Sequence, residues 1–209
     1  MISKDCFWIK NALPFKEQSD LVEFIQKRIK GKTIRSSSMI PSPKTLPIGK
    51  NDLDPCAKLT FQDDTAVNVF IKRSAKILQK KKLHICGERD ISLYKTISAA
   101  AIRYPSPDGR FPPHIDHCAG SFVYLASLGQ NARFMIKSPT MKKQIVISFR
   151  SGDVLVFDPS SEAAILHAVE GIEKEASESG EKLQHAFPKL LKGHRIGFQC
   201  RVFFNFRDK

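Results

Sequence analysis

The segment Phe111-Pro-Pro-His-Ile-Asp-His-Cys-Ala-Gly120 places two potential metal ligands two residues apart. In an extended chain alternate side chains point to the same face, so His114 and Asp116 face one way and Ile115 faces the other. An imidazole and a carboxylate on one face are two of the three ligands of a 2-His-1-carboxylate site. Such a site suits non-haem Fe(II), because it leaves positions open for a co-substrate and O₂. The alternative is an ordinary polar pair in a loop at the end of a strand.

A distant histidine is the candidate for the third ligand. His167 lies in the mostly apolar segment Ala-Ile-Leu-His-Ala-Val169, 51 positions after Asp116. We expect the preceding segment, 152–157, to form a hairpin with it that carries His167 back towards the first pair. The alternative is a core histidine whose nitrogens are satisfied inside the protein.

Two arginines on the last predicted strand indicate an anion. Arg195 and Arg201 are six residues apart, so alternation puts both on the same face. A guanidinium in an apolar strand needs an anionic partner, and a carboxylate bound through two hydrogen bonds satisfies it best. Beside an iron site this favours a dicarboxylate co-substrate, to which the Tyr104 hydroxyl is a further candidate donor. The alternatives are an internal ion pair and a core tyrosine.

The pattern of apolar segments predicts an α+β fold. Short strands separated by turns are expected at 97–104, 121–128, 132–137, 144–149, 153–157, 164–169 and 195–204, which is typical of a sandwich or jelly roll. Two amphipathic helices, one from Ser19-Asp20 to Gly31 and one after Asp63-Asp64-Thr65, should pack outside one sheet. We therefore expect an N-terminal extension at 1–90 and a catalytic core at 91–209. Residues 170–194 are predicted to be a mobile surface insertion.

The charge favours an acidic partner. The chain has 209 residues and a formal charge of +13, with 34 Lys and Arg against 21 Asp and Glu. This favours nucleic acid as the partner, although solvated lysines alone would give the same balance. The candidates for phosphate contact are the outward face of the second helix and a basic loop at 35–50, which is either a substrate lid or a plain surface loop. The residues concerned are Arg35, Lys44, Lys72, Arg73 and Lys76.

The sequence also bears on location. No apolar run is long enough to cross a membrane, and the N-terminus has no signal-peptide pattern. The five cysteines are scattered and lack a Cys-x-x-Cys motif, which fits reduced thiols. We therefore expect an intracellular protein, in the nucleus or cytoplasm, with no membrane partner.

Taken in order, these motifs resemble the AlkB-like Fe(II)/2-oxoglutarate-dependent dioxygenases over residues 97–205. The matching pieces are Arg103-Tyr104, His114-x-Asp116, Ser127-Leu-Gly129 with Ala132 and Phe134, Gly152-Asp-Val-Leu-Val-Phe157, His167 and Arg195-x5-Arg201. The resemblance implies a double-stranded β-helix, also called a jelly-roll or cupin-like fold, with the N-terminal helices on its major sheet. It implies Fe(II) held by His114, Asp116 and His167. It implies 2-oxoglutarate with its far carboxylate on Arg195 and Tyr104, and Arg201 beside the co-substrate or substrate.

The implied reaction couples decarboxylation of 2-oxoglutarate, to succinate and CO₂, with hydroxylation of a C–H bond by O₂. The bond typically belongs to an N-methyl group, which then leaves as formaldehyde, so the resemblance predicts oxidative demethylation of DNA or RNA. The chain departs from relatives that act on nucleic acid at Ile102, where they often have Asn, and at Cys118, where they often have an acidic residue. The sequence shows no aromatic pair that would sandwich a flipped base, and Phe61, Trp8 and the 35–50 loop are candidates to contact it. The alternatives are the same chemistry on a protein side chain and a non-catalytic binding module.

Overall fold

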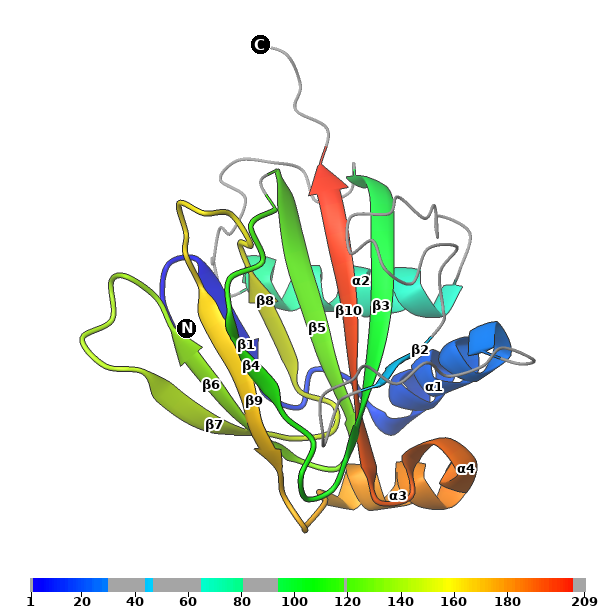
Figure 1. Ribbon diagram of the computed structural model, residues 1–209. Coiled ribbons are helices and arrows are strands. Elements are labelled where there is room, and N and C mark those ends of the chain that lie inside the picture. The colour runs from blue at the N-terminus through cyan, green and yellow to red at the C-terminus, as the bar shows by residue number, and fades with distance from the viewer. Residues whose placement is uncertain (1, 30–43, 47–64, 81–93, 119, 205–209) are drawn as a thin grey trace.

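Two antiparallel sheets face each other in the computed structural model, which describes residues 2–29, 44–46, 65–80, 94–118 and 120–204 (Figure 1). The major sheet has the order β1 (Cys6–Ile9), β8 (Val154–Phe157), β5 (Ser121–Gly129), β10 (His194–Phe204), β3 (Tyr94–Pro105) and β2 (Lys44–Leu46). The minor sheet has the order β4 (Phe111–His114), β9 (Leu166–Ile172), β6 (Ala132–Lys137) and β7 (Ile145–Phe149). This arrangement confirms the predicted α+β jelly roll.

Strand β5 divides the apolar interior into two cores, because its side chains alternate between the two faces of the major sheet. Val123 and Leu125 point into the space between the sheets, whereas Tyr124 and Ala126 point to the outer face. All four side chains are buried, so both faces of the sheet are covered.

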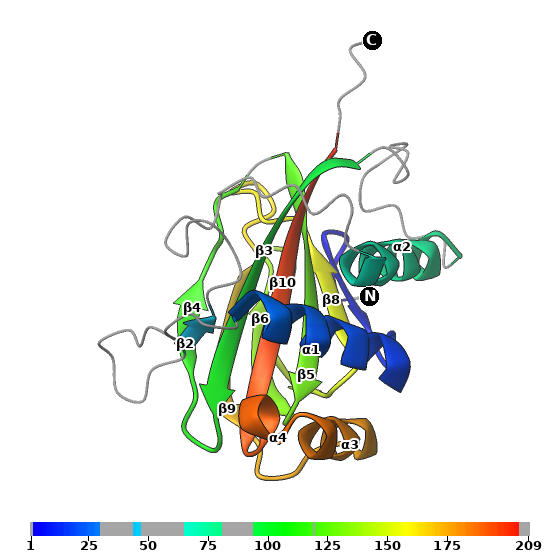
Figure 2. The same ribbon diagram turned by 90° about the vertical axis from the view of Figure 1, so that its right-hand side faces the viewer.

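Two helices cover the outer face of the major sheet, as the sequence predicts (Figure 2). They are α1 (Phe15–Ile29) and α2 (Thr65–Lys80), and their rings meet those of the sheet, with Phe24 5.9 Å from Phe198 and Phe70 6.4 Å from Tyr124 between centroids. The predicted start of α1 at Ser19 was wrong by four residues. The Pro14 carbonyl accepts the first helical hydrogen bonds, from the amides of Glu17 and Gln18, so Pro14 and not Ser19 sets the boundary.

The segment predicted to be mobile is instead ordered. It contains α3 (Glu178–Ala186) and α4 (Pro188–Leu191), which close one end of the molecule (Figure 1). The Ser177 side chain caps α3 by accepting a hydrogen bond from the amide of Gly180 at 3.3 Å. Leu183, Leu190 and Leu191 are buried, and this apolar side is the reason that the segment packs on the sheet.

The predicted hairpin of 152–157 with His167 was also wrong. Strand β8 pairs with β1 and β5 in the major sheet, while β9 pairs with β4 and β6 in the minor sheet. The chain therefore crosses between the sheets after Phe157, and it is this crossing that delivers His167 to the site.

The N-terminal strand is tied to the core by a buried carboxylate. Asp153 accepts hydrogen bonds from the Trp8 indole at 3.1 Å and from the Asn11 and Arg150 amides at 2.8 and 3.1 Å. Burial raises the pKa of Asp153 in spite of these donors. Trp8 is thus used to attach β1 to the turn before β8.

None of the helices within the described residues is long and apolar enough to cross a membrane.

Candidate active site

The three predicted metal ligands meet between the two sheets. His114 at the end of β4 lies directly opposite His167 on β9 in the strand register, and the two ring centroids are 4.2 Å apart. Asp116 follows two residues later on the same side as His114. Potential ligand atoms of the three side chains all lie within 4.8 Å of one another. A 2-His-1-carboxylate arrangement of this kind suits Fe(II) with open coordination positions.

Backbone carbonyls fix the orientation of both imidazoles. The Nδ1 atom of His114 lies 2.9 Å from the Pro112 oxygen, and Nδ1 of His167 lies 3.1 Å from the Ile165 oxygen. A carbonyl oxygen only accepts, so Nδ1 of each ring carries the proton and donates it. The Nε2 lone pair of each ring is then available for a metal.

The charge states also favour a metal. Burial by itself raises the pKa of Asp116, but His114, His167 and Arg201 together outweigh it and hold that pKa well below its usual range. Burial lowers the pKa of His167 to about 4. Burial also acts to lower the pKa of His114, but Asp116 and the Pro112 carbonyl reverse the effect and the net shift is upward. The site thus offers an ionised carboxylate and a neutral, buried imidazole, both in the form that binds metal.

Arg201 forms a buried ion pair with the metal-binding carboxylate. Its Nη2 atom lies 3.0 Å from Asp116 Oδ2, and the two side chains are 5% and 8% exposed. The pair orients the carboxylate, because a guanidinium holds one oxygen while the other, Oδ1, lies 3.5 Å from Nε2 of His114. The sequence predicts a place for Arg201 beside the co-substrate or substrate. This part of the prediction stays open, and the ion pair is a contact that the sequence did not reveal.

Arg195 has no such anion. It is 1% exposed, its Nε donates to the Ser127 hydroxyl at 3.1 Å, and Nη1 and Nη2 have no hydrogen-bond partner among the described residues. The guanidinium carbon lies 5.1 Å from the centre of the Tyr104 ring and 5.5 Å from that of Phe149. Burial lowers the pKa of Arg195 and raises that of Tyr104 to about 12, so the phenol stays neutral and can donate. A buried, unmatched guanidinium is costly unless a ligand supplies the anion.

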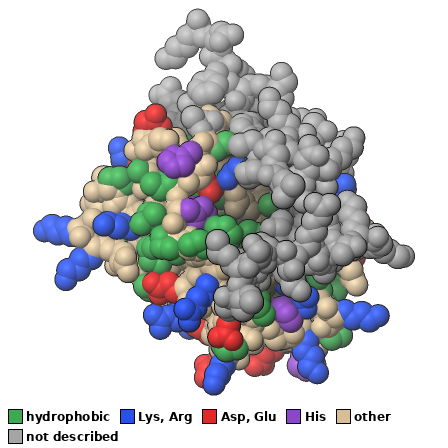
Figure 3. All heavy atoms as spheres, viewed as in Figure 1, with side chains coloured by type: hydrophobic (Ala, Val, Ile, Leu, Met, Phe, Trp, Pro, Cys, Tyr) green, Lys and Arg blue, Asp and Glu red, His purple; other side chains and the backbone are tan. Residues whose placement is uncertain are grey.

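A cavity joins Arg195 to the two histidines. It is small, with a volume of about 40 Å³, it opens partly to solvent, and its walls are mainly apolar. The residues around it are Ile102, Tyr104, Phe111, His114, Leu125, Phe134, His167, Ala168, Val169, Arg195, Gly197 and Gln199. The described part of this face shows histidine side chains among hydrophobic ones (Figure 3). A carboxylate at Arg195 and a metal at the histidines would thus share one cavity, which fits a dicarboxylate that reaches both.

Gly197 and Gln199 are among the cavity residues that the sequence reasoning missed, although a signal for these two existed. Gly197 and Gln199 lie between Arg195 and Arg201, and the same alternation that groups the arginines puts all four on the inner face of β10. A Cβ atom at Gly197 would lie 3.1 Å from Nη1 of Arg195. The absence of a side chain there keeps the guanidinium accessible from the cavity.

The predicted phosphate contacts lie elsewhere or outside the described residues. Lys72, Arg73 and Lys76 are on α2, which covers the outer face of the major sheet (Figure 2). The cavity lies on the other face of that sheet, between the two sheets. Arg73 donates through Nε to both carboxylate oxygens of Glu17 on α1, at 2.7 and 2.6 Å. Lys44 begins β2, opposite Arg103 of β3. Arg35, Phe61 and most of the 35–50 loop lie outside the described residues, so the predicted lid stays a prediction.

The two departures from the family pattern occupy different positions. Ile102 forms part of the apolar cavity wall. Cys118 is buried just after the metal carboxylate, and its carbonyl accepts a hydrogen bond from the Ser121 hydroxyl at 3.1 Å. Ile102 therefore helps to determine which ligands fit the cavity. The buried Cys118 instead stabilises the loop that holds Asp116.

Comparisons with known proteins agree with this geometry. The sequence pattern of the 2OG-Fe(II) oxygenase superfamily matches residues 5–201. The fold is similar to that of OsALKBH1, at 21% identity and a TM-score of 0.63, with 98% of this chain and 100% of the other covered. It is similar to a Pseudomonas putida prolyl-4-hydroxylase, at 10% identity and a TM-score of 0.56, with 97% and 94% covered. It is also similar to the viral collagen prolyl hydroxylase vCPH from Paramecium Bursaria Chlorella virus-1, in its 2OG complex. Here the identity is 16% and the TM-score is 0.54, with 96% of each chain covered. None of the curated proteins compared with the chain matches it in sequence.

Proposed function

Because the chain belongs to the 2OG-Fe(II) oxygenase superfamily, we propose that it uses this chemistry to remove N-linked alkyl groups from nucleic acid. The superfamily and the intact set of ligands establish an Fe(II)- and 2-oxoglutarate-dependent dioxygenase. The proposal concerns the substrate, and the observation that carries it is the charge of +13. Such a charge favours a polyanion over a neutral acceptor.

Each end of the cavity has a defined task in the proposed reaction. When bound, Fe(II) and 2-oxoglutarate supply O₂ activation, so that loss of CO₂ from the co-substrate accompanies hydroxylation of a substrate C–H bond. His114 and His167, each through Nε2, and Asp116 would hold the metal. Arg195 would bind the far carboxylate of the co-substrate through Nη1 and Nη2, and the neutral Tyr104 hydroxyl would donate to the same group.

The remaining residues control position and water. The apolar walls, which include Ile102, Leu125 and Phe134, would exclude water from around the metal and the co-substrate. Arg201 keeps the Asp116 carboxylate ionised and oriented. A hydroxylated N-methyl group then decomposes without help from the protein, breaking its C–N bond to give formaldehyde and the unmodified amine.

The test is succinate release by protein loaded anaerobically with Fe(II), on admission of air. The expected result is stimulation by N-methylated single-stranded DNA or RNA, with formaldehyde and the unmodified base formed in equal amounts. The unmethylated oligonucleotide of the same sequence is the matched control. If no methylated nucleic acid raises turnover while a peptide pool does, the proposed substrate is wrong.

A second substrate class has a specific observation in its favour. The chain shares its fold with two prolyl hydroxylases, and it carries Ile102 and Cys118 where nucleic-acid-acting relatives often have Asn and an acidic residue. Hydroxylation of a protein side chain would use the same metal and co-substrate ends of the cavity. Stimulation by peptides alone, with a gain of one oxygen in the peptide mass, would identify this second function.

A further inference from the structure

The turn that joins β6 to β7 is a compact basic projection. The last register pair of the two strands is Ile136 with Ile145, and the turn between them is ordered by a hydrogen bond from the Met141 amide to the Ser138 carbonyl at 3.0 Å. Lys137, Lys142 and Lys143 are exposed here, and they make no ion pair within the described residues. We refer to residues 137–144 as the basic hairpin.

No carboxylate in the neighbouring sequence weakens this charge. From His117 to Gly152 the chain has five Lys or Arg residues and no Asp or Glu. Arg133, further down β6, does have a partner, since its Nη2 lies 3.2 Å from Glu170 Oε2 on β9. The three lysines of the basic hairpin are therefore surrounded in sequence by basic groups alone, and no ion pair within the described residues compensates them.

The basic hairpin stands at the metal end of the cavity. Ile136, the residue before it, lies opposite His167 in the register of β6 with β9, and His167 in turn lies opposite His114. Two strand spacings, roughly 10 Å, thus separate β6 from β4 at this level. The His114 side chain is 34% exposed whereas His167 is 5% exposed, so the site opens to solvent on the His114 side. Lys and Arg side chains gather over this hairpin on the face that also shows the histidines (Figure 3).

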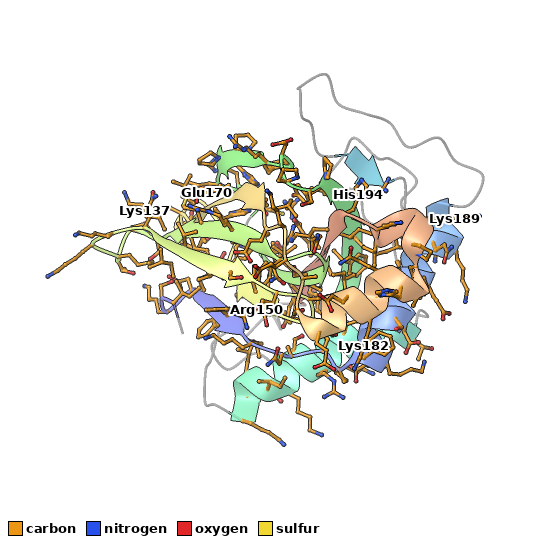
Figure 4. The ribbon with its side chains drawn as sticks, turned by 90° about the horizontal axis from the view of Figure 1, so that it is seen from below. Lys137, Arg150, Glu170, Lys182, Lys189 and His194 are labelled. Carbon is orange, nitrogen blue, oxygen red and sulfur yellow. The ribbon has the colours of Figure 1, made fainter. Side chains whose placement is uncertain are left out.

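The other basic regions lie further from the opening. The lysines of α2 are behind the major sheet, where Glu17, Asp20 and Glu23 of α1 line the groove between the two helices. Lys182 and Lys189, on α3 and α4, are at the closed end of the molecule, away from Lys137 on the minor sheet (Figure 4). Compared with the lysines of α2, α3 and α4, the hairpin combines charges that have no ion pair among the described residues with a place close to the metal ligands.

We propose that Lys137, Lys142 and Lys143 of the basic hairpin bind the phosphodiester backbone of the strand whose alkylated base enters the cavity. This inference rests on the proposed function. Lysine suits the task because its ammonium group binds phosphate as a point charge without a fixed geometry. The contacts position the strand and carry no sequence information, so the hairpin should contribute equally to binding of any base sequence.

The experiment measures binding of a fluorescently labelled, methylated single-stranded oligonucleotide by anisotropy over a range of salt concentrations. The protein is loaded with Mn(II) and 2-oxoglutarate, so that binding is observed without turnover. The variant K137Q/K142Q/K143Q is compared with the matched control K182Q/K189Q/K192Q, which removes three exposed lysines at the closed end. A third variant, K72Q/K76Q/K80Q, removes three lysines from α2.

Loss of three phosphate contacts should raise the Kd roughly tenfold and reduce the slope of log affinity against log salt by about 2. The control and the α2 variant should keep the slope of the unaltered protein, and thermal unfolding should be the same for all four proteins. If the hairpin variant keeps the slope, or if all three variants lose it equally, the hairpin assignment is wrong while nucleic-acid binding stands. If the unaltered protein binds no methylated or unmethylated oligonucleotide, the proposed substrate itself fails and the hairpin assignment falls with it.

Discussion

Two arginines on the inner face of β10 have opposite surroundings. Arg201 lies 3.0 Å from a buried carboxylate, whereas Arg195, six residues earlier on the same strand, has two nitrogens without a partner in the described structure. Both are almost fully buried. Alternation along a strand therefore predicts that the two side chains share a face, but it does not tell which anion each one meets.

The difference indicates a structural role for Arg201, which is paired within the protein, and a ligand-binding role for Arg195, which is not. A buried charge is tolerated when it is paired, and the pairing of Arg201 with Asp116 is internal. Arg195 is buried among Tyr104, Phe149 and Gly197, which supply no negative charge. Substitution should therefore affect folding at position 201 and co-substrate binding at position 195.

The largest effect is expected where the metal binds. His167→Ala removes one ligand and leaves both arginines in place, so succinate formation should fall to the background of metal-free protein. Titration with Mn(II), followed by calorimetry, should show loss of the tight site. His185→Ala, an exposed histidine on α3, is the control. Full turnover in the His167 variant would contradict the metal assignment.

Removal of the paired arginine should destabilise the fold. Arg201→Met leaves the Asp116 carboxylate buried without its cation, and breaking a buried pair in this way costs roughly 3–5 kcal/mol. Chemical denaturation of metal-free protein measures the free energy of unfolding. Arg133→Met breaks the exposed pair with Glu170 and should cost less than about 1 kcal/mol. Equal losses of unfolding free energy in the two variants would show that the buried ion pair stabilises the fold no more than the exposed one.

The sequence predicted the parts of the site that depend on short spacings. The two-residue interval from His114 to Asp116, and the six-residue interval from Arg195 to Arg201, each follow from the period of an extended chain. Tyr104 also lies where the motif order implied, against Arg195. The strands were placed because their apolar runs are separated by turn residues, and the helices because of their apolar stripes.

What depends on pairing between distant segments was not predictable from one sequence. His167 reaches His114 through a crossing between sheets, and nothing in residues 152–169 distinguishes a crossing from a hairpin. The ion pair of Arg201 with Asp116 joins residues 85 positions apart, so no local pattern reveals it. The insertion at 170–194 looked like a loop because its charges are dense, yet a few leucines were enough to dock two helices.

Removal of the unpaired arginine should affect the ligand and spare the fold. Arg195→Met should leave the unfolding free energy of the ligand-free protein unchanged or slightly higher, because an unmatched buried charge is lost. The KM for 2-oxoglutarate should rise about 100-fold, since charge-assisted hydrogen bonds are lost. Added 2-oxoglutarate should also no longer raise the Tm of Mn(II)-loaded protein. An unchanged KM would remove Arg195 from this role.

The smallest predicted effect tests whether Arg195 must be reachable from the cavity. In Gly197→Ala the new Cβ would lie 3.1 Å from Nη1 of Arg195, 3.6 Å from Nη2 of Arg195 and 3.6 Å from Cε2 of Tyr104, so the guanidinium must shift by a few tenths of an ångström. The shift should weaken the charged hydrogen bond from Arg195 to the co-substrate without abolishing it. The KM for 2-oxoglutarate should therefore rise by about tenfold, while the metal affinity stays the same. Gly171→Ala on β9, whose Cβ would meet only the Pro107 oxygen at 3.7 Å, is the matched control. If both alanine variants leave the KM unchanged, Nη1 and Nη2 of Arg195 do not bind the co-substrate from the side that Gly197 leaves open. A ligand other than 2-oxoglutarate would then have to explain why Arg195 lacks the carboxylate partner that Arg201 has.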